Sequence, residues 1–319
     1  MLNYIEIVKK PKQFLGLTSL TVEEFDYLCT PFEAEWRKYT IYYTQKGKRR
    51  KVPQVVCRTT NTLPEIEDKL FFILYVLKTN SLQEAISATY SMSQGKVSEW
   101  TTTLLPLLHE VLKRMRLTPS RDSYGLICKL EELEAKSVII DGTERPIQRS
   151  IDYGVQEIFY SGKKKDHAVK NNIIGIETQL ITYLSPTYEG STHDKKICDE
   201  EKIAYPDEIE LFQDTGFQGY NPGNVIIVQP EKKKKGQKLT MEQKQENREK
   251  SKKRVVIEHM ISGVKRCRIV KDVIRNLKKI GYDIVMDVCC GLHNLRVKNP
   301  LRAYSHTHVH ARDKLHFQI

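Results

Sequence analysis

The spacing of apolar residues changes near residue 131, and this change constrains the fold more than any other feature of the sequence. Before it, apolar side chains recur at intervals of three and four residues, as on one face of a helix, at Ile66, Leu70, Ile73, Leu74 and Leu77. After it, short apolar runs are bounded by turn-forming residues and are typical of strands. The chain is therefore predicted to place an all-α region before an α/β domain with a mixed sheet.

The helical region is predicted to contain a DNA-binding motif. Pro64 opens its first helix at a tolerated position, and Ser81 with Glu84 has the spacing of a capping box for the second helix. The third helix begins near Gln94, and Pro106 is expected to kink or restart it. Two short helices joined by a tight turn are typical of a helix-turn-helix, and a plain structural bundle fits the same pattern.

Residues 1–62 mix short apolar runs with basic stretches, and their structure is the hardest to predict. Thr21 and Glu24 have the spacing of a capping box, which predicts one short helix. Two β-like stretches, 39–44 and 52–57, flank a basic tip and predict a hairpin. This segment is expected to be a basic arm that binds DNA or mediates dimerisation.

The α/β region is predicted to hold several strands and a helix ahead of its most basic segment. The helix runs from about residue 194 to residue 204 and is capped by Ser191 or Thr192. The strands are expected at residues 137–140, 158–160, 173–176, 179–184, 210–213 and 224–228. Strands that come first and then alternate with helices fit a mixed sheet.

The net charge of the chain indicates a polyanionic partner. Lys and Arg exceed Asp and Glu by 12, and residues 231–254 alone carry eleven basic side chains against four acidic ones. Basic blocks on a folded protein favour nucleic acid, because each contact with a phosphate releases condensed counterions. A solvated surface loop would have the same composition, so charge alone leaves both interpretations open.

Other features exclude several classes of protein. The longest apolar run, residues 70–77, is eight residues long, whereas a membrane span needs ~20. The first residues lack the apolar core of a secretion signal. Seven cysteines without a C-x-x-C pair argue against a disulfide framework and against a structural zinc site. The sequence therefore predicts an intracellular protein in a reducing compartment.

Two aspartates stand where predicted strands end. Asp141 follows the apolar run 138–140, and Asp214 ends the strand at 210–213 and enters a glycine-containing turn. A carboxylate at the end of a strand is held rigidly with its oxygens pointing outward, as a Mg²⁺ site requires. Turn-forming or helix-capping aspartates are common and explain either residue equally well when it is taken alone.

Glu258 lies on an amphipathic helix predicted over residues 254–268. At ~100° per residue, the apolar side chains fall on one side, with Ile257 at the edge, namely Val256, Met260, Val264 and Cys267. The charged side chains Arg254, Glu258, Lys265 and Arg268 fall together on the face turned away from the sheet. Such a row fits a solvent-facing series of charge pairs, and it fits cations that steer phosphates toward a metal-binding glutamate.

The spacing of Arg254, Glu258 and Lys265 resembles the signature around the last acidic residue of insertion-sequence transposases of the DDE superfamily, in their Harbinger-like branch. Further pieces resemble this family in the same order along residues 63–296. They are the first-Asp strand at 138–144, the hairpin at 160–165 with His167 and Lys170, the helix start at 190–194, the second-Asp strand and turn at 213–220, and a closing element at 290–295. Ser251 departs from the family, which often carries Tyr at this position.

The resemblance implies an RNase H-like catalytic domain in which Asp141, Asp214 and Glu258 form the catalytic triad. These residues would hold two Mg²⁺ ions, with Mn²⁺ as a substitute, for cleavage at the transposon ends and joining of the 3′-OH ends to target DNA. The residues implied to bind double-stranded DNA are Lys96, Ser98 and Trp100 in the helix-turn-helix, Lys163, Lys164 and Lys165 in the hairpin, and Arg254 and Lys265 on the catalytic helix.

The predicted domains are the basic segment 1–62, the helix-turn-helix domain 63–130 and the RNase H-like domain 131–319. Coupled cleavage of two transposon ends predicts a homodimer or a higher oligomer on DNA, associated with the nucleoid in the cytoplasm and with no membrane.

The alternative is a transposase-derived protein that binds DNA specifically without cleaving it, and acids at all three triad positions argue against it. The sequence does not distinguish a transposase from a structure-selective nuclease that hydrolyses DNA without strand transfer.

The C-terminal tail is rich in histidine. His306, His308 and His310 alternate, and His316 follows. On a strand the alternating imidazoles would line one face and bind a transition metal, whereas a flexible tail would have no such role.

Overall fold

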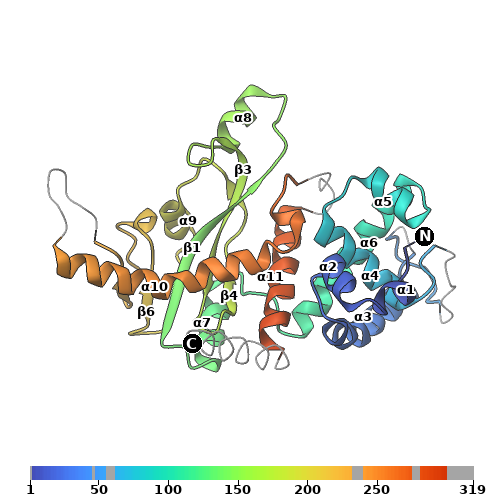
Figure 1. The fold of residues 1–319 in the computed structure, drawn as a ribbon, viewed down its shortest axis with the longest axis horizontal. Helices are drawn as coiled ribbons and strands as arrows, with labels where there is room; N and C mark the ends of the chain where they lie inside the picture. The colour runs from blue at the N-terminus through green and yellow to red at the C-terminus, as the bar shows by residue number, and fades with distance from the viewer. Residues whose placement is uncertain (1, 45–46, 55–61, 232–239, 275–280, 300–319) are drawn as a thin grey trace, which may run out of the picture.

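The computed structural model describes residues 2–44, 47–54, 62–231, 240–274 and 281–299. The N-terminal part of the chain forms a helical bundle, drawn in blue to cyan in Figure 1. Its helices are α1 (Tyr4–Val8), α2 (Pro11–Thr18), α3 (Val22–Tyr42), α4 (Ile66–Thr79), α5 (Gln83–Tyr90) and α6 (Gln94–Arg114). The sequence predicts a domain boundary between residues 62 and 63. Because α3 packs on both α4 and α6, the segments on the two sides of this boundary share one core.

Helix α3 begins as the sequence predicts and ends later. The capping box of Thr21 and Glu24 is confirmed, with both of its hydrogen bonds present. The strand predicted at 39–44 is wrong, because α3 continues through most of this stretch. The ring of Tyr39 stacks on that of Trp36 within the helix, with 6.1 Å between the centroids. This packing outweighs the local preference of aromatic and β-branched residues for strands.

The hairpin predicted from 39–44 and 52–57 forms in part. Tyr43 and Arg49 make an antiparallel bridge at the end of α3. Residues 55–57 lie outside the described residues. The basic tip is therefore a short turn that follows a helix, since the first of its two predicted strands is largely helical.

Helices α4, α5 and α6 occupy the region predicted as a helix-turn-helix. The N-cap of α5 is Leu82, so the capping box predicted for Ser81 does not form. The side chain of Ser93 caps α6 by accepting a hydrogen bond from the backbone N–H of Lys96 at 3.3 Å. Helix α6 is continuous through Pro106, contrary to the expected restart, and buried leucines on both sides of the proline hold it in the bundle.

A mixed sheet follows the bundle in the chain. Its strands are β1 (Ser137–Pro146), β2 (Tyr160–Ser161), β3 (Asp166–Gly175), β4 (Ile181–Leu184), β5 (Tyr188–Glu189), β6 (Glu210–Phe212) and β7 (Ile226–Val228). Strand β1 lies at the centre, antiparallel to β3 and parallel to β6, and β7 extends the sheet in parallel beyond β6. Strands β2, β4 and β5 all pair with β3. The predicted mixed sheet is confirmed.

One predicted strand is a helix. The expectation for residues 158–160 is wrong, because Tyr153–Phe159 form α8 and β2 begins at Tyr160. The side chain of Asp152 caps α8 by accepting a hydrogen bond from the backbone N–H of Val155 at 3.0 Å. An apolar run of three residues fits a helix or a strand, and the capping aspartate stabilises the helix.

The two faces of the sheet pack against different helices. Val138 and Ile140 point to the face covered by α7 (Ser123–Glu132) and α9 (Asp194–Glu201). Ile139 points to the opposite face, where it shares a core with α10 (Met241–Val264) and α11 (Tyr282–Lys298). Because side chains alternate along a strand, this pattern fixes the face on which each later residue of β1 lies.

Helix α11 joins the sheet to the N-terminal bundle. It packs on α6, α10 and β4, and Figure 1 shows it between the bundle and the sheet. A hydrophobic core therefore continues from the bundle through α11 to the strands and fixes α4 and α6 relative to the sheet. Within the described ranges, every helix is too short or too polar to cross a membrane.

Candidate active site

Two aspartates lie side by side where β1 and β6 end their parallel pairing. Ile139 pairs with Phe212, so Asp141 and Asp214 each lie two residues beyond the same point of the register. Alternation along the strand directs Asp141 to the α10 face, as it does Ile139. Asp214 also caps the short 3-10 helix η1 (Thr215–Phe217), because its carboxylate accepts a hydrogen bond from the backbone N–H of Gly216 at 2.6 Å. The sheet thus brings together the two aspartates singled out in the sequence.

The surroundings of Asp141 disfavour its charged form. Burial, followed by the nearby carboxylate of Asp214, raises the pKa of Asp141 from 3.8 to about 6. A hydrogen bond at 2.8 Å from the backbone N–H of Gly142, together with the guanidinium of Arg254, opposes part of this rise. Asp194 adds a smaller repulsion. A divalent cation would relieve this crowding of like charges.

Glu258 reaches the same place from α10. The helix extends from Met241 to Val264, so it begins earlier and ends earlier than the predicted 254–268. Ile257 and Met260 are buried against the sheet, whereas Glu258 is exposed. As the sequence predicts, Glu258 therefore lies off the face of α10 that is buried against the sheet. Helix α10 crosses the strands (Figure 1), so its charged flank opens onto the edge of the sheet where the aspartates lie.

The three carboxylates line one cleft of about 860 Å³. Its walls come from β1, the turn after β6, α10 and the turn between β2 and β3. Its cationic lining residues are Lys78, Lys163, Lys164, Arg254, Lys265, Arg266, Arg268 and Lys271. The cleft therefore combines oxygen ligands suited to Mg²⁺ with cations suited to phosphates.

Four of these cations were predicted as DNA contacts from the sequence, namely Lys163, Lys164, Arg254 and Lys265. Lys165, predicted with them, lies in the adjoining turn with a positive φ of 56° and does not line the cleft. Lys78 was missed because it comes from α4 in the N-terminal bundle. Its Nζ donates a hydrogen bond to the backbone carbonyl of Arg266 at 3.0 Å. Arg266 and Lys271 could have been inferred from the basic run after Glu258, whereas no local signal marks Lys78.

Arg254 and Lys265 flank Glu258 along α10 and its C-terminal end. The guanidinium of Arg254 lies 4.0 Å from the carboxylate of Asp214. Burial, followed by repulsion from Lys164, lowers the pKa of Lys265. Cations that crowd one another in a half-buried cleft would be stabilised by an anionic ligand, and a phosphate backbone is such a ligand.

The donor set fits a divalent cation, although it is not a closed cage. Mg²⁺ prefers carboxylate oxygens and keeps several waters, so a few protein ligands are enough. Among the residues that the structure describes, no three His, Cys, Asp or Glu side chains converge closely enough to hold an ion as they stand. The register of β1 with β6, which brings Asp141 and Asp214 side by side, supports the fit, because a shared cation would offset the repulsion between the two carboxylates.

Comparisons with known proteins agree with this geometry. The model of a family described as DDE superfamily endonuclease matches residues 140–294, which include Asp141, Asp214 and Glu258. The chain is also 24% identical over 288 residues to the probable transposase for insertion sequence element IS702 of Microchaete diplosiphon, covering 89% of this chain and 94% of that protein. Both comparisons support a DDE insertion-sequence transposase. No solved structure matches it.

The residues on α6 that the sequence predicts to bind DNA differ in their environments. Lys96 is about half exposed and forms an ion pair with Glu99 at 2.9 Å. Ser98 is partly buried at the surface. Trp100 is 1% exposed, and its ring lies 5.9 Å from that of Trp36. The expectation that Trp100 faces DNA is corrected, because its side of α6 points into the bundle.

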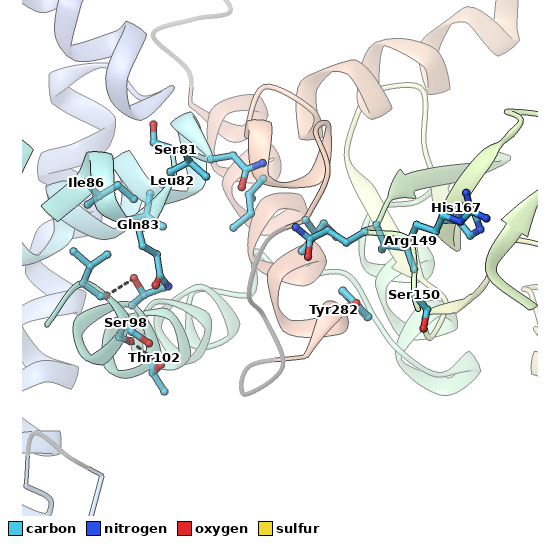
Figure 2. A pocket seen from close by; sticks show the side chains of 18 of the residues that line it. Ser81, Leu82, Gln83, Ile86, Ser98, Thr102, Arg149, Ser150, His167 and Tyr282 are labelled. Atoms are coloured by element: carbon cyan, nitrogen blue, oxygen red, sulfur yellow. Dashed lines mark hydrogen bonds between the residues drawn. The ribbon is translucent and has the colours of Figure 1, made fainter. Parts of the chain in front are cut away.

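A second and larger cleft of about 1080 Å³ separates α5 and α6 from the segment that follows β1. Figure 2 shows Ser98 and Thr102 of α6 on one side of it and Arg149 and Ser150 on the other. None of the three triad carboxylates lines this cleft. The candidate active site is therefore the smaller, more strongly charged cleft.

Two further sequence predictions, besides the strand expected at 52–57, concern residues outside those described. The histidine-rich tail, with His306, His308, His310 and His316, is one of them. The other is the most basic part of the predicted DNA-binding loop, residues 232–239.

Proposed function

We propose that this transposase binds the ends of its element as double-stranded DNA, cleaves them and joins the freed 3′-OH ends to target DNA. The observation that carries this proposal is the single cleft lined by Asp141, Asp214 and Glu258 and bordered by cations. Hydrolysis and strand transfer are both in-line phosphoryl transfers, so one site can perform both reactions.

Asp141 and Asp214 would be the main ligands of two divalent ions, Mg²⁺ or Mn²⁺, and Glu258 would complete the site. When bound, such ions stabilise the attacking and leaving oxygens of the reaction. The parallel pairing of β1 and β6 holds the two aspartates in place, so little reorganisation is needed before DNA arrives. An RNase H-like domain from residue 131 onward is the fold that this arrangement favours.

The cations around the carboxylates would position the DNA backbone. Lys163 and Lys164 reach the cleft from the turn between β2 and β3, and Arg254 and Lys265 reach it from α10. Lys165 in the same turn would contact the backbone farther from the cleft. Contacts of this kind fix the orientation of the duplex and carry no sequence information.

Recognition of the transposon ends would fall to the helices α5 and α6 as a helix-turn-helix. Lys96 and Ser98 lie in the first turns of α6, where such motifs contact DNA. Because the reaction couples two ends, the active form would be a homodimer or a higher oligomer on DNA. A DNA-binding protein without cleavage is the alternative, and it has no use for three carboxylates in a phosphate-binding cleft.

The test is cleavage of a duplex that carries the DNA flanking this gene, with Mg²⁺ or Mn²⁺. Wild type is compared with Asp214→Asn and Glu258→Gln, which keep the side-chain shapes. Glu242→Gln is the matched control, because Glu242 lies in the first turn of the same helix and does not line the cleft. We expect metal-dependent nicking at a defined end by wild type and the control, and none by the other two variants.

Tight binding of the ends without cleavage under every metal condition would contradict the enzymatic function and leave the DNA-binding alternative. Cleavage that survives both active-site substitutions would show that the reaction occurs elsewhere. Transfer of a labelled 3′-OH end into a second duplex then separates a transposase from a nuclease that only hydrolyses.

A further inference from the structure

We infer that Lys170 is a positioning residue that prevents two additional carboxylates, those of Glu144 and Asp194, from capturing the cation of the active site. This inference rests on the metal-dependent function proposed above. It concerns a buried cluster directly behind Asp141 that the triad does not include.

Lys170 is shared between the two carboxylates. It is the cross-strand partner of Glu144 in the antiparallel pairing of β1 and β3. Its Nζ lies 3.5 Å from Oε1 of Glu144 and 3.2 Å from Oδ1 of Asp194. It also donates a hydrogen bond to the backbone carbonyl of Thr192 at 2.8 Å. The side chains of Lys170 and Glu144 are each 9% exposed, so a single ammonium group balances two carboxylates almost out of water.

Both carboxylates lie close to the proposed metal site. Glu144 lines the same cleft as the triad. Asp194 approaches the backbone next to Asp141, because a Cβ at Gly142 would lie 2.6 Å from its Oδ1. A side chain at Gly142 would push Asp194 away, so the glycine permits this close approach. The repulsion that Asp194 exerts on Asp141 follows from the same proximity.

One oxygen on each carboxylate is left without a hydrogen bond. Oε2 of Glu144 and Oδ1 of Asp194 are buried, and neither has a hydrogen-bond partner in the described structure. The contact of Lys170 with Oδ1 of Asp194 is close enough for an ion pair but does not have hydrogen-bond geometry. Buried carboxylate oxygens with incomplete partners are costly, and a divalent cation would satisfy them.

The position of Asp194 is fixed independently of Lys170. The side-chain amide of Asn172 donates a hydrogen bond to the backbone carbonyl of Asp194 at 2.8 Å. Loss of the ammonium would therefore leave the backbone of Asp194 in place and two uncompensated carboxylates close to Asp141. A cation would then bind between Glu144 and Asp194, in the place of the ammonium and away from Asp214 and Glu258.

The test measures binding of Mn²⁺ to the DNA-free protein, from the electron paramagnetic resonance signal of the free ion, together with the cleavage rate. Lys170→Met is compared with Lys170→Arg and with the triple variant Lys170→Met, Glu144→Gln, Asp194→Asn. We expect Lys170→Met to bind additional Mn²⁺ and to cleave about 10–100-fold more slowly. Lys170→Arg should resemble wild type, and the triple variant should return Mn²⁺ binding to the wild-type level.

A purely structural role of Lys170 would weaken Mn²⁺ binding and cleavage together, so a gain in binding with a loss of rate is diagnostic. Equal Mn²⁺ binding by wild type and Lys170→Met would overturn the inference. If Lys170→Met does not fold, a folded triple variant supports the charge argument, and a triple variant that also fails to fold overturns it. A wild-type protein that binds no Mn²⁺, or binds it equally well with Asp141→Asn, would instead contradict the proposed function.

Discussion

His293 is a buried imidazole between α10 and α11, and we predict that it makes the protein sensitive to acid. Its side chain is 4% exposed, and its Nε2 lies 2.9 Å from the backbone carbonyl of Gln179. The ring packs against α10, because a Cβ at Gly263 would lie 2.3 Å from Nδ1. Burial, followed by the nearby guanidinium of Arg296, lowers the pKa of His293 from 6.5 to about 4. The contact that would be disturbed holds the helix that carries Glu258.

The lowered pKa has a definite consequence for stability. Between pH 6.5 and about 4 the unfolded chain takes up a proton at His293, whereas the folded protein does not. The free energy of unfolding is therefore complete above pH 6.5 and falls as the pH is lowered through this window. A tenfold change in proton affinity is worth about 1.4 kcal/mol, so the loss at pH 4 is about 3 kcal/mol. Domains are typically stable by ~5–15 kcal/mol, so the loss is substantial.

The assay is urea unfolding between pH 4 and pH 8, without added metal, followed by far-ultraviolet circular dichroism. His293→Gln keeps a donor for the carbonyl of Gln179 and cannot titrate. We expect it to be less stable than wild type at pH 7, because packing is lost, and the difference to shrink by about 3 kcal/mol at pH 4. His259→Gln is the control, because His259 is exposed on α10, the helix against which His293 packs. Parallel stability curves for wild type and His293→Gln would refute the reasoning.

Further predictions concern the active-site cleft and its support. In the metal-free protein, Asp141→Asn should raise the free energy of unfolding at pH 8 by about 3 kcal/mol, because the pKa of Asp141 is raised from 3.8 to about 6 and the cost of ionising this carboxyl grows as the pH rises between these two values. Urea unfolding at pH 8 and pH 4 tests this, and a gain of equal size at pH 4 contradicts it. Arg145→Ala should cost about 3 kcal/mol in the same assay, because the buried guanidinium donates to Asn171 at 2.6 Å and to Thr187 at 2.9 Å. Lys164→Gln should lower the slope of log affinity for DNA against log salt by about 1, measured by fluorescence anisotropy, and an unchanged slope would remove Lys164 from the phosphate contacts.

Local patterns in the sequence were reliable where one strong signal governs a segment. The capping box at Thr21 starts α3 as predicted, and the apolar run before Asp141 forms the central strand. They failed where a short apolar or aromatic stretch fits two structures. Residues 158–160 are mostly helical because Asp152 caps α8, and residues 39–44 are mostly helical because Tyr39 packs against the bundle as part of α3. A period of two or of 3.6 residues cannot be distinguished over so few positions.

By itself, the sequence determined which residues could do the chemistry. Asp141 and Asp214 each follow an apolar run that must be buried, and Glu258 lies beside the apolar stripe of a helix, so burial of those runs forces the carboxylates to the edge of the core. Tertiary structure alone decided which side chains meet. The register of β1 with β6 aligns the two aspartates, and the packing of α4 on the 3-10 helix Arg268–Val270 brings Lys78 of the bundle to the cleft. The tertiary structure also placed Lys170 between Glu144 and Asp194. Burial acts on each segment locally and can be read from its pattern, whereas contacts between distant segments depend on how strands pair and helices pack.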